Sequence, residues 1–254
     1  MGRFSRLRSA RALRGLAARH DEPTSFTDGD LPTSVAIIMD GNARWAKERR
    51  LPIAVGHREG AKALKRVVRH ASDLGIKDLT VFSFSTENWA RPESEVQDLM
   101  ALFCELIDKE TTELTEENVR MRFIGRLDEL PAELQERIAW SQDTTRPNTG
   151  LNLYVAMNYG SRGEIVDAAR RFVATHGDQG GEAEFASCMY EDAMRDPELI
   201  IRTSGEQRLS NFLLWQGAYA ELYFSDRLWP DWGPDDLEAA LRHYAGCQRR
   251  FGAR

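Results

Sequence analysis

The sequence predicts a single α/β domain with a mostly parallel central sheet flanked by helices. Short apolar runs recur along the chain, and runs of this kind are typical of strands buried on both faces of a parallel sheet. Helix-period apolar patterns separate these runs, and polar clusters directly follow several of them. Open α/β sheets bind their ligands at the edge where the strands end, so we expect the polar clusters to face one another there.

Apolar runs predict the strands in chain order. Strands are expected over 35–39, 79–84, 119–124 and 151–157. One further apolar run, 199–201, precedes an arginine-rich loop.

Helical periodicity predicts the segments between the strands. A helix can start within 42–50, and Pro52 is expected to break any helix before His57. Further helices are expected over 58–74, 93–117, 131–141, 164–175 and 234–248. The wide apolar stripe of the 93–117 helix fits ordinary core packing, and it also fits an apolar tunnel between the sheet and the helices over 58–74 and 93–117.

Composition is that of an ordinary soluble globular protein, with 254 residues, 42% of them apolar and 29% charged. The net charge is −6 although residues 1–20 hold six arginines and no acid, so the acidic excess falls on the rest of the chain. A surface of this kind argues against nucleic acid as a nonspecific partner.

Cysteine spacing and hydropathy indicate the compartment. Cys104, Cys188 and Cys247 are far apart and form no C-x-x-C pair, so a disulfide framework or a thiolate zinc site is not expected. No apolar run approaches the ~18 residues of a membrane span. We therefore expect a cytoplasmic protein that associates with a membrane only through its first residues, if at all.

Residues 1–30 are expected to be a basic extension, and residues 31–254 the folded domain. Arginines alternate with apolar residues in 1–20. Two interpretations stay open for this segment: a basic amphipathic helix on an anionic membrane surface, or a disordered basic tail.

The first polar cluster follows the 35–39 run. Asp40 would lie at the carboxyl end of that strand, and Gly41 allows a tight turn and close approach to a ligand. Asn42 and Arg44 add donors at the start of a helix, where anions are favoured. One carboxylate among such groups indicates a divalent metal held against a phosphate, whereas the simpler alternative is that Asp40 only caps a helix.

Other polar clusters follow the later runs. Residues 83–92 and 158–163 are rich in hydroxyl, amide and charged groups. Residues 202–211 contain two arginines, two serines and a glycine, a composition suited to a diphosphate clamp or, alternatively, to a surface salt-bridge loop. Glu221 is a lone acid in an apolar and aromatic run, where a carboxylate needs a partner or a metal.

Several motifs in order give the sequence a recognisable pattern. They are Asp40-Gly41-Asn42-x-Arg44-Trp45, Gly56-His57, Ser85-Thr86-Glu87-Asn88-Trp89-x-Arg91-Pro92, Asn158-Tyr159-Gly160, Arg202-Thr203-Ser204-Gly205-Glu206 and Arg208-x-Ser210-Asn211-Phe212, followed by the Glu221 segment. Together they closely resemble the cis-prenyltransferases, the family of undecaprenyl diphosphate synthase. The resemblance covers about residues 34–253 and leaves the basic extension outside.

The resemblance implies a magnesium-dependent enzyme that adds isopentenyl diphosphate to an allylic prenyl diphosphate and forms a cis double bond. It also implies a homodimer. The small side chain of Ser83 leaves the start of the expected tunnel open, which favours a medium-to-long polyprenyl product. Product length and the allylic primer are not given by the sequence.

Site residues follow by matching position. Asp40 and Asn88 match the catalytic residues, and Asp40 and Glu221 match the Mg²⁺ ligands. Positions that match substrate-binding residues are Gly41, Asn42, Ala43, Arg44, Trp45, His57, Ser85, Thr86, Glu87, Trp89, Arg91, Arg202, Arg208, Leu209 and Ser210.

The sequence departs from the family pattern at Ile53, where an arginine is usual four residues before the histidine. One diphosphate contact should then be missing, or come from Arg49, Arg50 or Arg58. A trans-prenyltransferase is rejected because the chain has no Asp-Asp-x-x-Asp motif. A non-catalytic partner subunit or a polyprenyl-carrier binding protein of the same fold remains the alternative.

Overall fold

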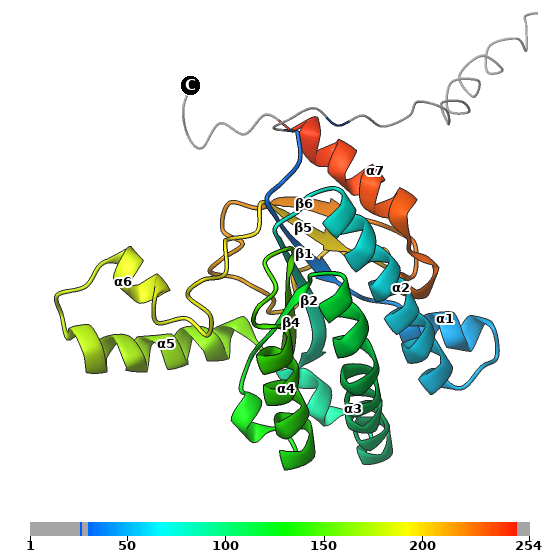
Figure 1. Cartoon of the computed structure of the whole chain (residues 1–254), viewed down its shortest axis with the longest axis horizontal. Coiled ribbons are helices and arrows are strands. Elements are labelled where there is room, and N and C mark those ends of the chain that lie inside the picture. Colours follow the sequence, from blue (N-terminus) through cyan, green and yellow to red (C-terminus); the bar gives the residue numbers. More distant parts are fainter. Residues whose placement is uncertain (1–25, 27–29, 248–254) are drawn as a thin grey trace, which may run out of the picture.

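The computed structural model describes Phe26 and residues 30–247 (Figure 1). The predictions for the basic extension therefore lie almost wholly outside the described residues, as does the end of the last predicted helix. Within the described part, no helix combines the length and the apolar character that crossing a membrane requires.

Six strands form one sheet in the order β3-β4-β2-β1-β5-β6, and all neighbouring pairs are parallel. The strands are β1 (Ser34–Ile38), β2 (Asp78–Ser85), β3 (Arg120–Ile124), β4 (Asn152–Tyr159), β5 (Leu199–Arg202) and β6 (Glu221–Phe224). The predicted α/β domain with a parallel sheet is thus confirmed.

Successive side chains of β1 point to opposite faces of the sheet, and both faces are covered. Val35 and Ile37 belong to a core cluster that includes residues of the helices on one face of the sheet. Ala36 and Ile38 belong to a second cluster on the other face, together with Phe212. All five residues of β1 are buried, and the four that follow Ser34 are apolar, as expected for a strand covered on both faces.

Helices surround the sheet (Figure 1). They are α1 (Asn42–Glu48), α2 (Ile53–Asp73), α3 (Glu93–Glu116), α4 (Ala132–Thr145), α5 (Ser161–His176), α6 (Glu182–Ala186) and α7 (Pro234–Ala245), with short 3-10 helices η1 (Thr86–Ala90), η2 (Leu127–Glu129) and η3 (Trp229–Asp231). Residues of α2, α3, α4 and α7 share the first core cluster, whereas α5 extends away from the sheet.

The sequence located most elements but missed three details. Pro52 is the N-cap of α2 rather than a break before His57, because its fixed φ suits the residue before a helix. Strand β4 continues through Asn158 and Tyr159, which the sequence placed in a loop. Neither the short edge strand β6 nor the five-residue α6 was predicted, because segments this short carry little periodicity.

Two glycines bring α1 against α2 and so position the loop after β1. A Cβ on Gly56 would lie 2.2 Å from the backbone oxygen of Asn42, and a Cβ on Gly60 would lie 2.4 Å from the Asn42 Oδ1. Such distances are shorter than any real contact, so glycine is required for this approach.

We predict that Gly56→Ala lowers the free energy of unfolding by about 1–3 kcal/mol, the usual cost of overpacking. Urea unfolding would measure it. Gly163→Ala in α5 is the matched control, because its nearest neighbour is the flexible Arg126 guanidinium at 3.4 Å. Alanine favours a helix, so the control should keep or gain stability. Equal losses in both variants would contradict the close-approach argument.

Candidate active site

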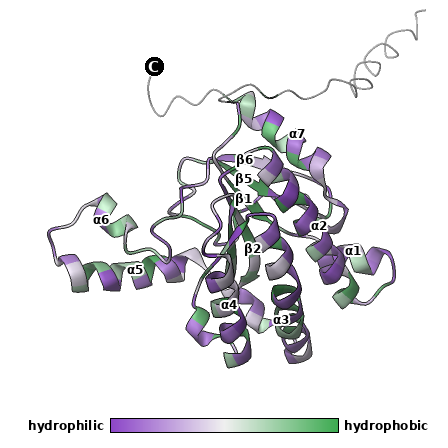
Figure 2. Ribbon diagram, in the orientation of Figure 1, coloured by the Kyte–Doolittle hydropathy of each residue, from purple (hydrophilic) through white to green (hydrophobic). Residues whose placement is uncertain are grey.

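A cavity of about 730 Å³ lies between the sheet and helices α2 and α3. Its mouth is polar and is lined by Asp40, Asn42, His57, Ser85, Glu87, Asn88, Arg91, Arg202, Arg208, Ser210 and Asn211. Its interior is mostly apolar, with Leu64, Val68, Leu99, Phe103, Leu106, Ile107, Leu114, Met121, Leu153, Val155 and Met157. The strands are largely hydrophobic while the flanking helices carry residues of both kinds, so the apolar helix faces complete the cavity (Figure 2).

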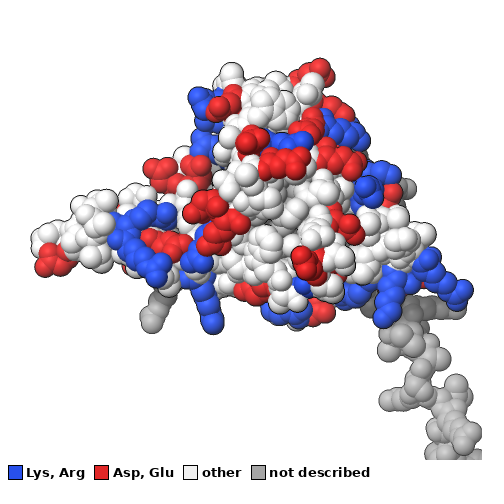
Figure 3. Space-filling model, turned by 90° about the horizontal axis from the view of Figure 1, so that it is seen from below, with Lys and Arg blue, Asp and Glu red and all other residues white. Residues whose placement is uncertain are grey.

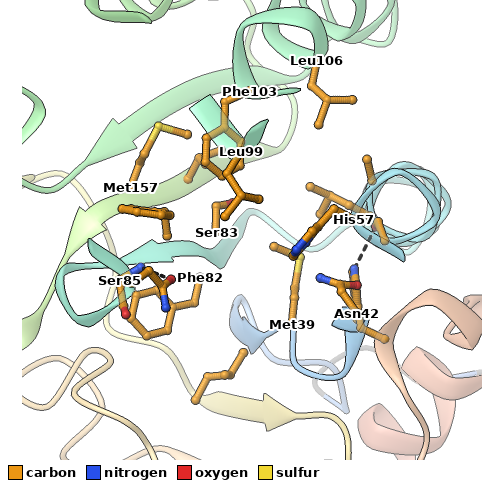
Figure 4. A pocket seen from close by; sticks show the side chains of 18 of the residues that line it. Met39, Asn42, His57, Phe82, Ser83, Ser85, Leu99, Phe103, Leu106 and Met157 are labelled. Atoms are coloured by element: carbon orange, nitrogen blue, oxygen red, sulfur yellow. Dashed lines mark hydrogen bonds between the residues drawn. The ribbon is translucent and has the colours of Figure 1, made fainter. Parts of the chain in front are cut away.

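The close-up shows how the cavity is walled. Asn42 and His57 lie on the side of α1 and α2, Ser85 lies across from them at the end of β2, and Leu99 and Phe103 project from α3 (Figure 4). The pairing of β2 with β4 shifts register between Phe82 and Phe84. A bulge of this kind re-aims side chains, which explains why Phe82, Ser83 and Phe84 in succession all line the cavity.

Asp40 and Arg202 form the central ion pair of the mouth. The Asp40 Oδ2 accepts a hydrogen bond from the Arg202 Nη2 at 2.9 Å, and the Arg44 Nη2 lies 3.5 Å from the same oxygen. Burial alone would raise the pKa of Asp40, but hydrogen bonds with Arg202 and Ser204 and the charges of Arg202 and Arg44 outweigh it. The pKa of Asp40 is therefore lowered, and its carboxylate is ionised at neutral pH.

Arg202 also holds the loop that follows β5. Its Nη1 donates to the Ser210 Oγ and to the backbone oxygen of Arg208, both at 2.6 Å. The Arg202 side chain is 5% exposed, and its Nε is buried without a hydrogen-bond partner in the structure. One guanidinium thus joins the two regions that the sequence assigned to separate diphosphates.

Backbone hydrogen bonds fix the loop after β1 to the loop after β5. The Asp40 backbone N–H donates to the Thr203 Oγ1 at 2.9 Å, and the Thr203 hydroxyl donates to the Asp40 backbone oxygen at 2.7 Å. Ser204 and Ser210 have φ values of 78° and 48°, so this loop turns through left-handed conformations. Thr203 was quoted within a motif but was not predicted as a site residue, because its role is visible only when both loops are placed.

The loop after β2 is organised by its own side chains. Ser85 and Asn88 form a capping box around η1, in which the Ser85 N–H donates to the Asn88 Oδ1 at 3.0 Å. Burial would raise the pKa of Glu87, but hydrogen bonds from its own N–H, Asn211 and neighbouring hydroxyls lower it overall. The Trp89 Nε1 donates to the Asn158 Oδ1 at 2.8 Å, which ties the loop to the end of β4.

His57 is a neutral group in the cavity wall. Burial lowers its pKa, and the positive charge of Arg91 lowers it further, while Glu95 opposes this. The His57 Nε2 is buried and has no hydrogen-bond partner in the structure. This nitrogen is therefore available to a polar atom of a bound ligand.

The structure brings most predicted site residues to one mouth, but not all of them. Seven predicted residues come from the same segments as lining residues but do not line the cavity themselves: Gly41, Ala43, Arg44, Trp45, Thr86, Trp89 and Leu209. Trp45 bonds Asp231 through its Nε1 at 2.7 Å and so anchors α1 to η3. Of the three replacements considered for an arginine at Ile53, Arg49 is paired with Asp231 and Arg58 with Glu105, whereas a role of Arg50 stays a prediction.

Glu221 is not near Asp40 within one chain. Glu221 pairs with Leu199 at the amino end of β5. Leu199 precedes Arg202 by three residues, which corresponds to about 10 Å along a strand. Asp40 lies beyond the opposite end of the strands and bonds Arg202. The metal-ligand role that the family pattern implies for Glu221 therefore finds no support in the geometry of a single chain.

The residues present fit a divalent cation that is shared with a ligand. Among the described residues there is no group of three or more His, Cys, Asp and Glu side chains that could hold a metal by itself. The ionised Asp40 carboxylate, 29% exposed at the cavity mouth, offers one hard oxygen ligand. Mg²⁺ typically takes one or two carboxylates and completes its shell with phosphate oxygens and water.

One face of the molecule carries charges of both signs. On the face seen from below, acidic and basic side chains are interspersed (Figure 3). That face therefore offers no extended surface of a single charge sign.

Comparisons with known proteins agree on one family. The family model described as putative undecaprenyl diphosphate synthase matches residues 38–252. An isoprenyl transferase of Thermotoga maritima is 48% identical over 226 residues, covering 87% of this chain and 97% of the relative. The ditrans,polycis-undecaprenyl-diphosphate synthase of Micrococcus luteus, described as (2E,6E)-farnesyl-diphosphate specific, is 43% identical over 228 residues, covering 87% and 92%.

A solved structure agrees with the fold. Lavandulyl diphosphate synthase from Lavandula x intermedia, in complex with dimethylallyl diphosphate, superposes with a TM-score of 0.86 at 36% identity. The similarity covers 89% of this chain and 100% of the lavender chain.

We predict that His57 makes the protein less stable in weak acid. Because its pKa is lowered in the folded state, the unfolded chain binds its proton more readily, and stability is lost as pH falls below 6.5 toward the lowered value. Urea unfolding at neutral and mildly acidic pH should show a smaller acid loss for His57→Gln than for wild type. His243 is exposed, so His243→Gln is the control and should lose as much stability in acid as wild type does. If His57→Gln also loses as much stability in acid as wild type, His57 is not the cause of the loss.

Proposed function

This chain belongs to the family described as putative undecaprenyl diphosphate synthase, whose members are prenyl-transferring enzymes, and we propose that it adds isopentenyl diphosphate to an allylic prenyl diphosphate. The product is a medium-to-long polyprenyl diphosphate, and inorganic diphosphate leaves. The observation that carries the proposal is the Asp40–Arg202 pair at the polar mouth of a cavity with an apolar interior. Such a cavity suits a substrate with a charged head and a hydrocarbon tail.

The allylic diphosphate is assigned to the loop after β1. Gly41 has a φ of 112°, and a Cβ there would lie 2.9 Å from the Leu228 side chain, so the turn after β1 and its packing on Leu228 favour glycine. Asn42 begins α1, and Arg44 is held near Asp40 by hydrogen bonds to Ser204. When bound at Asp40, Mg²⁺ would neutralise charge on the departing diphosphate.

Isopentenyl diphosphate is assigned to Arg202, Arg208 and Ser210. The unpartnered Nε of Arg202 and the half-exposed guanidinium of Arg208 offer charge-assisted donors to a phosphate. This set would hold the nucleophilic substrate beside the allylic carbon, which supports catalysis by orientation.

Asn88 is proposed to orient the reacting substrate. Its amide is not a base at neutral pH, and its Oδ1 already accepts the Ser85 N–H. The remaining amide donors and the Ser85 hydroxyl are the groups of this loop that can contact the condensation site. Asn88 would thus guide removal of the proton rather than accept it.

The apolar interior is proposed to take up the growing chain. Ser83 lines the cavity with a small side chain, and Leu99, Phe103 and Leu106 from α3 form the opposite wall. Burial of hydrocarbon there is favourable by about 25 cal/mol per Å² of apolar surface. This favours repeated additions over release after one.

A homodimer and a peripheral membrane contact through residues 1–20 complete the proposal. Strand β6 is at the edge of the sheet, and Leu214 and Leu222 are exposed apolar residues, at 37% and 40%. An unpaired sheet edge with apolar neighbours suits contact with a second copy. Residues 1–20 lie outside the described part, and their membrane role rests on their arginines alone.

We predict that Asp40→Asn lowers kcat about a hundredfold or more, because it removes a charged group where charge develops in the transition state. Removing Mg²⁺ with a chelator should also abolish turnover. The assay follows labelled isopentenyl diphosphate with the purified chain alone, which also separates an enzyme from a non-catalytic partner subunit. An Asp40→Asn enzyme within tenfold of wild type would refute the role of this carboxylate.

Arg208→Ala should raise the KM for isopentenyl diphosphate by roughly ten- to a hundredfold with little change in kcat, because a charge-assisted hydrogen bond contributes about 1.5–3 kcal/mol. Arg208 is a cleaner probe than Arg202, whose loss would also leave Asp40 without its partner. Arg242→Ala in α7 removes an exposed arginine far along the chain and should leave both constants unchanged. If the KM of the allylic primer rises instead, the two diphosphate assignments are exchanged.

A further inference from the structure

A row of ion pairs joins α2 to α3, with every cation on α2 and every carboxylate on α3 or on its C-cap residue, Glu117. The pairs are Arg58–Glu105, Lys65–Glu110, Lys65–Glu113, Arg69–Glu113 and Arg69–Glu117, and we call this row the α2–α3 ladder. These two helices also wall the apolar cavity. The ladder therefore runs along the seam of that wall.

One pair of the ladder belongs to the cavity itself. Lys65 and Glu110 line the cavity, whereas Arg58 and Glu105 do not. The Lys65 and Glu110 side chains are 21% and 20% exposed, compared with 54% and 58% for Arg58 and Glu105. Their Nζ and Oε2 atoms lie 3.0 Å apart. An ion pair thus interrupts an otherwise apolar stretch of wall.

This pair lies part of the way along the cavity. His57 marks the mouth on α2, and Lys65 follows it by about 12 Å at ~1.5 Å per helical residue. The cavity continues past the pair to Val68 on α2 and Leu114 on α3. A hydrocarbon that fills the inner end must therefore pass Lys65 and Glu110.

Passing the pair is electrostatically unfavourable. Burial would lower the pKa of Lys65, but hydrogen bonds and charges of Glu113 and Glu110 raise it overall, so the ammonium stays charged. The Glu110 Oε2 is buried and has only this ammonium to compensate it. Hydrocarbon against the pair would displace the remaining water, and desolvating charges costs free energy.

We infer that the Lys65–Glu110 pair is a length-determining element of the cavity, which limits how far a growing polyprenyl chain extends toward Val68 and Leu114. The inference rests on the proposed function, because it concerns the product of that reaction. It assigns length control to a polar pair between two helices rather than to a bulky side chain at the end of the cavity.

The test replaces both charges with apolar side chains of similar size in the full chain, Lys65→Met with Glu110→Met. Products made from farnesyl diphosphate and excess isopentenyl diphosphate are measured by mass spectrometry. The product distribution should shift to longer chains by one or more isoprene units. Arg58→Met with Glu105→Met is the matched control, since it removes a ladder pair outside the cavity, and it should keep the wild-type distribution.

The remaining outcomes contradict either the inference or the proposed function. An unchanged distribution in the Lys65 and Glu110 variant overturns the inference, and so does an equal shift in the control, which would assign length to the stiffness of the seam. If the double variant does not fold, Glu110→Gln is used instead, because glutamine keeps the shape of the side chain without its charge. This variant should shift the product distribution to longer chains by a smaller amount. An unchanged distribution would overturn the inference. If wild type makes no prenyl product, the proposed function fails and the inference falls with it.

Discussion

The buried guanidinium of Arg202 is the constraint on which the rest of the site depends. A cation that is 5% exposed must have compensating partners, because water cannot supply them. Asp40 supplies the charge, and Ser210 and the Arg208 carbonyl supply hydrogen bonds. These contacts fix the loops after β1 and β5 relative to each other, while the Nε remains free of protein partners. The same cation is therefore both structural support and the start of an anion site.

The sheet makes this arrangement possible. Because β1 and β5 are parallel neighbours, Ile38 and Arg202 are paired and their following loops leave the sheet at the same edge. Thr203 then joins the two loops through the Asp40 backbone. The loop after β2 reaches the same edge, and its capping box around η1 presents Ser85 and Asn88 to the cavity.

Polar side chains line the mouth of the cavity, and mostly apolar side chains of the sheet and of helices α2 and α3 line its interior. Near the mouth, α1 and α2 contribute the polar side chains of Asn42 and His57, and the later turns of α2 and α3 present mostly apolar side chains to the cavity. The outward faces of the same helices carry charges that pair across the seam. Ion pairs across this seam tolerate small changes in helix spacing better than a packed apolar contact does.

The sequence by itself determined the fold class and the chemistry at the strand ends. Strands buried on both faces are mostly apolar, so the run 35–39 marked β1 in the sequence, and Asp40 directly after it marked the ligand-binding edge. Ordered motifs then identified the family. Helix ends and short elements were less certain, since Pro52 serves equally as a break or as an N-cap, and β6 is too short to show alternation.

Only the tertiary structure decided which of these residues meet. Sequence order says nothing of strand order, so it could not show that Arg202 bonds both Asp40 and Ser210, or that Glu221 lies at the opposite end of its strand. Nor could it show that Lys65 and Glu110, ordinary surface residues by type, line the cavity as a pair. Such contacts depend on the register of strands and the rotation of helices, which arise from packing of the whole chain rather than from any local pattern.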